Sequence, residues 1–137
     1  DELGLPVVIH QRSALAETLA ILEEARPAAG GVLHCFDDGP EVVPRAAALG
    51  FKLGLGGCLT YGHAPLTEAV RIAPAEMLVL ETDAPWLEPE PRSLRRNEPG
   101  LLPRVVRRLC ELRGWTPEEA DRVTTANARD LFRLPAA

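Results

Sequence analysis

Three side chains in this sequence could form a metal site, because of their chemical types and their positions beside short apolar runs. His10 and His34 each lie at or near the end of such a run, and Asp83 follows another one at residues 77–81. Imidazole nitrogens and a carboxylate oxygen are the usual ligands of a hydrolytic divalent-metal site that keeps one position open for water. Either histidine alone could instead be a half-buried residue with one hydrogen bond. Their equivalent positions favour a shared site.

Further polar residues lie close to these three in the sequence. Glu81 precedes Asp83 by two positions, so in an extended strand the two carboxylates point the same way. Glu81 could support a ligand histidine from behind, or it could be a polar strand end. Arg92, Arg95 and Arg96 crowd one loop, and guanidinium groups suit phosphate oxygens.

Three other features have simpler interpretations. His63 follows Tyr61-Gly62 and is expected to be a solvent-facing turn residue. The pair Asp37-Asp38 is expected in a solvated turn. The glycines at positions 54, 56 and 57 do not complete a dinucleotide-binding spacing, so they indicate close backbone approach.

The elements that would position these residues alternate between strands and helices. Short apolar runs predict strands at residues 6–10, 32–36, 51–56 and 77–81. Helical spacing and end signals predict helices at about 14–26, 40–49, 64–72, 103–113, from 117 onward and near 126–132. Ser13 and Thr116 are the expected N-caps, and Gly50 is expected at a C′ position. The proline-rich segment 84–99 is a candidate functional loop.

Strands that alternate with helices at intervals of about 25 residues are typical of βα units and a parallel sheet. Ligand sites in such folds lie at the carboxyl ends of the strands. Four strands cannot close an eight-stranded barrel, which takes about 250 residues. We therefore expect an α/β fold that is half of a TIM-type barrel, with extra C-terminal helices, and a single partial barrel domain over residues 1–137. The missing initiator methionine and the early strand suggest a start inside a larger polypeptide.

Composition limits the possible function classes. The net charge of −5 provides no global basic field for nucleic acid, so any phosphate binding must be local. No apolar run approaches the roughly 20 residues of a membrane helix. Cysteines at 35, 58 and 110 are odd in number and widely spaced, which disfavours disulfides and a thiolate zinc site. We expect a protein of the reducing cytoplasm.

Six segments in order carry a family resemblance: 5–10, 31–36, 49–57, 80–87, 96–99 and 125–132. They include Pro-Val-Val-Ile-His, Val-Leu-His-Cys-Phe, Glu-Thr-Asp-Ala-Pro and Arg-Asn-Glu-Pro. Together they resemble the TatD family of metal-dependent deoxyribonucleases. The resemblance implies the C-terminal half of a (β/α)8 barrel of the amidohydrolase type. It also implies one or two divalent metal ions (magnesium, manganese or zinc) and phosphodiester cleavage at DNA ends.

The resemblance assigns roles to residues. His10, His34 and Asp83 would be metal ligands, and Asp83 would also be the catalytic proton acceptor for a metal-bound hydroxide that attacks phosphorus. Glu81 would be the second-shell partner of a ligand. Arg96 and Asn97 would bind the DNA or other phosphodiester substrate.

Several departures from the family pattern limit these assignments. A full member also has a His-x-His pair on its first strand and a glutamate on its fourth, so His10, His34 and Asp83 would form one wall of the site. The missing barrel half, or a second copy of the chain, is the expected partner. The family's Ser-Gly-Ser is replaced by Asp37-Asp38-Gly39, and its His-Arg-Gly by Arg92-Ser93-Leu94.

Two other functions stay open at this point. The chain could be a catalytically incomplete fragment or a non-enzymatic module that self-associates through an open sheet edge. It could also belong to a barrel hydrolase of small esters or lactones. The arginine cluster favours a phosphate substrate over the latter.

Overall fold

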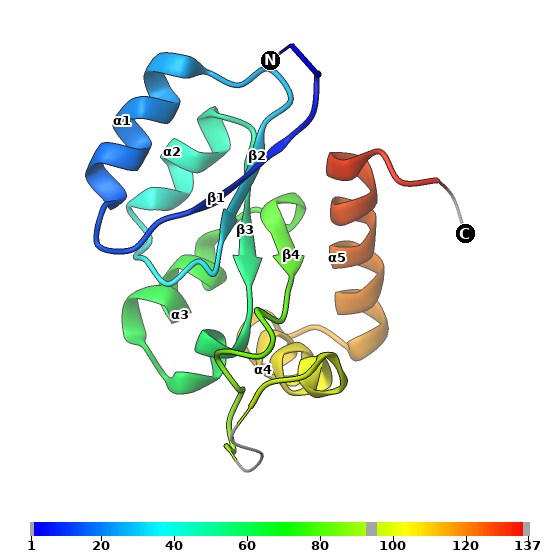
Figure 1. The fold of residues 1–137 in the computed structure, drawn as a ribbon. Coiled ribbons are helices and arrows are strands. Elements are labelled where there is room, and N and C mark those ends of the chain that lie inside the picture. Colours follow the sequence, from blue (N-terminus) through cyan, green and yellow to red (C-terminus); the bar gives the residue numbers. More distant parts are fainter. Residues whose placement is uncertain (1, 93–95, 136–137) are drawn as a thin grey trace.

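The computed structural model describes residues 2–92 and 96–135. Its centre is a parallel sheet in which the strands lie in the order of the sequence (Figure 1): β1 (Val7–His10), β2 (Gly31–His34), β3 (Phe51–Leu55) and β4 (Leu78–Leu80). The α-helices are α1 (Leu15–Ala25), α2 (Val42–Ala48), α3 (Ala64–Ile72), α4 (Leu102–Arg113) and α5 (Pro117–Phe132). Short 3-10 turns are η1 (Gly57–Tyr61), η2 (Ala75–Met77) and η3 (Pro99–Leu101). The predicted α/β fold with four parallel strands is confirmed.

The ends of the helices follow the expected local chemistry in two of three cases. Thr116 caps α5, because its Oγ1 accepts a hydrogen bond from Glu119 N at 3.2 Å. Gly50 follows α2 with a φ of 71°, which a glycine adopts without steric cost. Ser13 was the wrong N-cap: α1 is preceded by Ala14, whose N–H donates to Gln11 Oε1 at 3.3 Å.

The last predicted helix is not a separate element. Residues 126–132 continue α5, which runs without interruption from Pro117 to Phe132. No glycine or proline lies inside this stretch, so no residue removes a helical hydrogen bond or favours a break.

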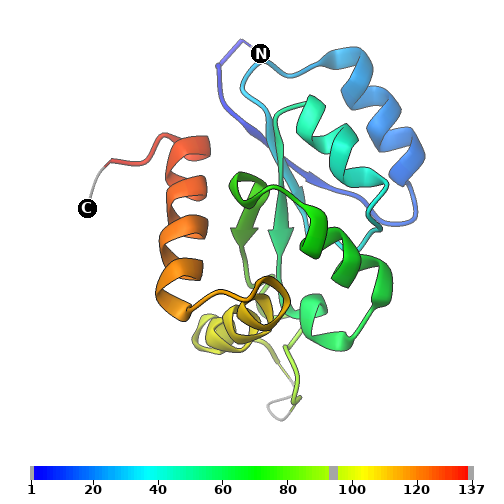
Figure 2. The same cartoon turned by 180° about the vertical axis from the view of Figure 1, so that it is seen from behind.

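Helices cover the two faces of the sheet unequally. Alternate strand residues, including Leu33, Leu53 and Leu78, point to one face and join the main apolar core with α1 to α4. On the opposite face, Val32 and Val79 form a smaller cluster with Leu131 of α5. α5 therefore reaches the opposite face of the sheet beside β4, as Figure 2 shows from behind.

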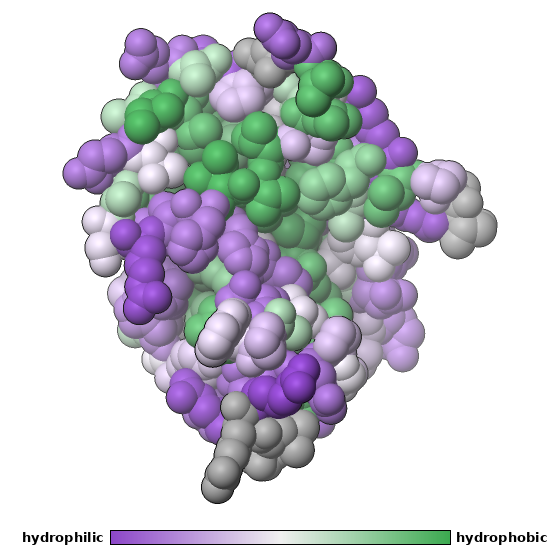
Figure 3. Space-filling view, in the orientation of Figure 1, coloured by the Kyte–Doolittle hydropathy of each residue, from purple (hydrophilic) through white to green (hydrophobic). Residues whose placement is uncertain are grey.

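The face of the sheet that α1 to α4 leave uncovered is partly apolar at the surface. Figure 3 shows a hydrophobic area in the upper part of this side of the molecule, with hydrophilic residues below it. Val8 of β1 is 58% exposed and Leu5, just before it, is 61% exposed. β1 is an edge strand, since β2 is its sole neighbour among the described strands. No helix in the described parts of the chain has the length and apolar character needed to cross a membrane.

Candidate metal centre

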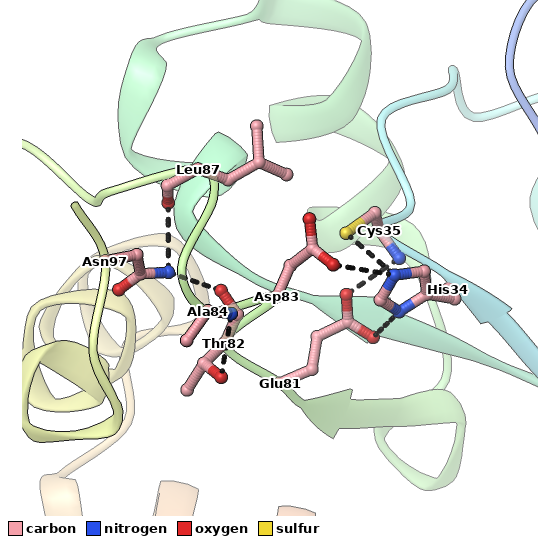
Figure 4. A network of polar contacts seen from close by, with 8 residues as sticks. All are labelled: His34, Cys35, Glu81, Thr82, Asp83, Ala84, Leu87 and Asn97. Atoms are coloured by element: carbon pink, nitrogen blue, oxygen red, sulfur yellow. Dashed lines mark hydrogen bonds and ion pairs between the residues drawn. The ribbon is translucent and has the colours of Figure 1, made fainter.

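The sheet brings the predicted ligands to its carboxyl edge. His10 and His34 are the last residues of β1 and β2, and the parallel register pairs them directly. Their ring centroids lie 5.9 Å apart. Asp83 follows β4 and lies against His34, as Figure 4 shows. Three strand ends therefore meet at one place.

His34 lies between two carboxylates. Its Nδ1 is 3.0 Å from Glu81 Oε2, and its Nε2 is 3.1 Å from Asp83 Oδ1. A neutral imidazole carries one N–H and one lone pair. When Nδ1 donates to Glu81, the Nε2 lone pair faces the Asp83 carboxylate, and only a cation or proton between them makes that contact favourable. This geometry suits a ligand histidine supported from behind by a carboxylate.

Glu81 is fixed at both of its oxygens. While Oε2 contacts His34, Oε1 accepts a hydrogen bond from Cys35 N at 2.8 Å. Gly54 provides the room, because a Cβ at this position would lie 2.3 Å from Glu81 Oε2. Gly54 thus allows a close approach, although it is made by the side chain of Glu81 and not by the backbone that was predicted for these glycines.

Two residues of the site adopt unusual backbone conformations. Asp83 has a φ of 53° and Cys35 a φ of 49°, both in the left-handed region that costs non-glycine residues free energy. Such conformations persist where the surroundings determine them and occur often at functional sites. At Asp83 the turn is closed by Trp86 N, which donates to Asp83 O at 2.8 Å.

Cys35 belongs to the site, which sequence reasoning missed. Its Sγ is 3.3 Å from His34 Nε2, and potential ligand atoms of His34, Cys35 and Asp83 all lie within 4.8 Å of one another. Burial, followed by the hydrogen bond with Glu81, raises the pKa of the Cys35 thiol. The signal in the sequence that indicates Cys35 is its position directly after the candidate ligand His34.

A large acidic cleft opens in front of these groups. It has a volume of about 1140 Å³, and its lining includes His10, Asp37, Asp38 and Asp83. The Asp37-Asp38 pair is more ordered than a solvated turn, because Asp38 Oδ2 accepts a hydrogen bond from Gln11 Nε2 at 2.7 Å. Partial burial raises the pKa of Asp38. The acidic lining favours cations at the carboxyl edge of the sheet.

His63 lies at the edge of this region. It is exposed, as predicted, at the residue before α3, and its Nδ1 is 2.9 Å from Asp37 Oδ1. This pair ties the segment after β2 to the start of α3. The contact spans 26 residues, so the local sequence around His63 does not indicate it.

The two predicted substrate-binding residues have different environments. Arg96 is exposed and lines a second cleft of about 460 Å³ beside the acidic one. Asn97 is 2% exposed, and its amide Nδ2 donates to the carbonyl oxygens of Thr82 and Leu87. These contacts hold the loop around Asp83, and substrate contact by Asn97 stays a prediction. Arg95, also in the predicted arginine cluster, lies outside the described residues.

The donor set fits a divalent cation. Imidazole nitrogen and carboxylate oxygen suit zinc, manganese and magnesium to different degrees, and a thiol sulfur adds a preference for softer ions. His34 Nε2 and Asp83 Oδ1 face each other from separate strands, and His10 lies next to His34. His10, His34 and Asp83 would hold the ion, with Cys35 in reach.

Comparison with known proteins identifies the family. The family model described as TatD related DNase matches residues 1–133. The chain belongs to the TatD related DNase family. It is 39% identical over 135 residues to the "Uncharacterized metal-dependent hydrolase YabD" of Bacillus subtilis, with 97% of this chain and 53% of that protein covered. It is 43% identical over 143 residues to the "3'-5' ssDNA/RNA exonuclease TatD" of Erwinia billingiae, with 98% and 54% covered.

A solved TatD structure shows the same architecture. The crystal structure of YjjV, a TatD homologue from Escherichia coli K12, superposes with a TM-score of 0.91 at 31% identity, covering 98% of this chain and 52% of that one. The chain spans about half the length of the curated relatives it matches. The predicted fold, half of a TatD-type barrel, is confirmed.

Proposed function

We propose that this chain forms the C-terminal part of a metal-dependent phosphodiesterase that cleaves DNA. The observation that carries the proposal is the position of His34 between Glu81 and Asp83 at the carboxyl edge of the sheet. A divalent ion bound there would activate water and stabilise negative charge on the phosphoryl oxygens. The relatives named metal-dependent hydrolases and 3'-5' ssDNA/RNA exonucleases support the same class of reaction.

Three residues of the chain have separate roles in the proposed hydrolysis. The bond between the water oxygen and phosphorus forms, and the phosphorus–oxygen ester bond breaks. The Asp83 carboxylate accepts a proton of the water, and the leaving oxygen takes up a proton in return, so that it departs as the hydroxyl group of the released nucleotide. Glu81 keeps the His34 ring in one orientation through Nδ1. Arg96, in the cleft beside the centre, binds a phosphate of the substrate through its guanidinium group.

The chain supplies one wall of this site. His10 and His34 end β1 and β2 of a four-stranded sheet, Asp83 lies just after β4, and the matched relatives are about twice as long. We propose that further ligands come from the other half of the barrel or from a second copy of the chain. The side of the sheet with the exposed Val8 faces such a partner.

The test replaces the proposed proton acceptor. Asp83→Asn in the intact polypeptide keeps the size of the side chain but removes its charge, so hydrolysis of a single-stranded oligodeoxynucleotide should fall by about a hundredfold or more. Chelation of divalent ions should abolish the activity of the unmodified protein. Asp130→Asn, on the exposed surface of α5, is the matched control and should keep normal activity.

Circular dichroism and thermal unfolding establish that both variants fold. A folded Asp83→Asn protein with the activity of the control would disprove the catalytic assignment. Activity that survives thorough chelation would disprove the metal-dependent mechanism.

A further inference from the structure

The proposed function places a phosphodiester at Asp83 but leaves open what holds the rest of the substrate. We propose that Trp86 and Arg92 form a subsite for the nucleotide next to the cleaved bond. The indole ring of Trp86 would stack on the base, and the guanidinium of Arg92 would bind the phosphate. This inference rests on the proposed function, because it extends the same substrate past the metal centre.

Trp86 lies where two clefts meet. It lines the acidic cleft that contains Asp83, and it also lines the second cleft that contains Arg92 and Arg96. The side chain is 70% exposed, although tryptophan is usually well covered in folded proteins. An exposed aromatic ring three residues after the proposed catalytic group offers a stacking surface for a base.

The two clefts have opposite charge. Among the described residues, the acidic cleft includes Glu17, Asp37, Asp38 and Asp83 in its lining, with Arg12 as its one arginine. The described lining of the second cleft has two arginines, Arg92 and Arg96, against one glutamate, Glu88. Cations therefore favour the first cleft and phosphates the second, although the chain as a whole carries a charge of −5. A nucleic acid strand that crosses Trp86 would place one phosphate at a cation held in the first cleft and the next phosphate at the arginines of the second.

Glu88 does not cancel the positive charge of the second cleft. Its carboxylate is 8% exposed and lies 4.0 Å from Arg104 Nη1. Arg104 is held in place by hydrogen bonds to the carbonyl oxygens of Pro89 and Pro91. Arg104 therefore offsets part of the charge of Glu88, so that Glu88 competes less with a ligand for Arg92 and Arg96.

Arg92 is oriented before any substrate arrives. Its guanidinium carbon lies 4.2 Å from the centroid of the Tyr61 ring, and its Nε is 3.2 Å from Glu90 Oε1. The Tyr61 hydroxyl in turn donates to Glu88 O at 2.9 Å, which fixes the ring. A guanidinium has five N–H donors, so the contact at Nε leaves others for phosphate oxygens.

The backbone that carries Trp86 is also held on both sides. Trp86 N donates to Asp83 O, and Asn97 N donates to Pro85 O at 2.9 Å. Asn97 Nδ2 adds a hydrogen bond to Leu87 O at 3.4 Å. A stacking residue on a fixed loop loses little conformational freedom on binding, which favours affinity.

Binding of two fluorescently labelled ten-residue oligomers, one of deoxythymidine and one of abasic sugar phosphate, tests the stacking role. Anisotropy is measured in EDTA, so that neither metal nor hydrolysis contributes. The unmodified protein should prefer the deoxythymidine oligomer by about tenfold, since stacking on an aromatic ring contributes about 1–3 kcal/mol per base. Trp86→Ala should remove this preference, because it should weaken the binding of the deoxythymidine oligomer and leave the binding of the abasic oligomer unchanged. Trp86→Phe should restore most of it.

The same oligomers test Arg92. Because phosphate contacts are independent of the base, Arg92→Gln should weaken the binding of both oligomers equally, by about threefold to tenfold. It should also lower the slope of the binding constant against salt concentration, on logarithmic axes, by about one. Arg122→Gln is the matched control, because Arg122 is exposed on α5 and lines neither cleft. It should leave both affinities unchanged.

The possible outcomes distinguish a wrong subsite from a wrong proposed function. A Trp86→Ala protein that keeps the full preference for deoxythymidine, or an Arg92→Gln protein that behaves like Arg122→Gln, overturns the subsite. A Trp86-dependent preference in a protein that hydrolyses no oligomer with any divalent metal supports the subsite and overturns the proposed function.

Discussion

At the scale of single residues, Glu81 explains how the site is held together. Its two oxygens accept from different groups, His34 Nδ1 and Cys35 N, which lie next to each other at the end of β2. One carboxylate thus orients both the candidate ligand and the backbone turn that follows it. Support of this kind from behind a ligand histidine commonly controls metal affinity.

Glu81→Gln should weaken metal binding by about 10–100-fold. A carboxamide has an NH2 donor in place of one oxygen, so either His34 Nδ1 or Cys35 N would lose its acceptor and face a donor. The loss of charge also lowers the basicity of the imidazole. Titration calorimetry with zinc or manganese on the intact polypeptide measures the effect. Glu76→Gln, on the exposed turn η2, is the control and should bind metal normally. Equal affinities in the two variants would contradict the role of Glu81.

At the scale of elements, the loop after β4 packs tightly on η1. A Cβ added to Gly57 would lie 1.7 Å from Leu87 O, so no side chain fits between the two backbones. Tyr61 OH and Thr60 Oγ1 add hydrogen bonds from the same turn to the loop. The position of the loop that carries Asp83 and Trp86 therefore depends on a glycine in another element.

Gly57→Ala should destabilise the protein by about 1–3 kcal/mol, the usual cost of overpacking, because one of the two backbones must shift. Gly100→Ala in η3 is the matched control: an added Cβ there meets no atom within 4 Å, so the free energy of unfolding should change little. Urea unfolding at equilibrium measures both. Similar free energies of unfolding for the two variants would show that the loop after β4 shifts away from η1 without loss of stability.

A second connection between elements is made by Arg113. Its Nη1 lies 2.8–3.0 Å from the carbonyl oxygens of Val70, Arg71 and Ala73, at the C-terminal end of α3. Helix ends leave such carbonyls without partners, and a cation there also interacts favourably with the helix dipole. The last residue of α4 thereby holds the end of α3.

Arg113→Met should lower the free energy of unfolding by about 1.5–3 kcal/mol, because methionine fills space but donates no hydrogen bond to these carbonyls. Arg107→Met, at an exposed position of the same helix, controls for helix propensity and charge. Chemical denaturation compares the two variants. A loss in Arg113→Met no larger than in the control would mean that water replaces the arginine without penalty.

At the scale of the whole molecule, the chain has one well-packed side and one open side. α1 to α4 cover the main core, whereas the other side exposes Val8 and Leu5 near the edge strand β1. Edge strands with exposed apolar residues tend to pair with other chains.

The 137-residue chain, prepared by itself, should therefore self-associate at micromolar concentration. Val8→Glu introduces a charge on the open face and should shift sedimentation towards the monomer. Ile21→Glu, on an equally exposed apolar residue of α1, is the control and should sediment like the unmodified chain. Equal effects of the two substitutions would show that association is unspecific.

Much of the architecture followed from local sequence. The strands and most helices were predictable because apolar spacing, glycine after α2 and the Thr116 cap act within a few residues. Ser13 failed as a cap because the backbone has a φ of 57° at that residue, and the Gln11 side chain accepts a hydrogen bond from Ala14 N just before the helix. Short-range signals cannot show which of two neighbouring polar residues reaches the helix.

The sequence by itself determined the types of the candidate ligands and their places at strand ends, since both depend on local pattern. Only the tertiary structure decided that Glu81 and Asp83 hold His34 from opposite sides and that Cys35 joins them, because these contacts span 46 to 49 residues. Side chains so distant in sequence meet only through the register of parallel strands. The same holds for the two clefts that share Trp86, whose walls come from separate loops.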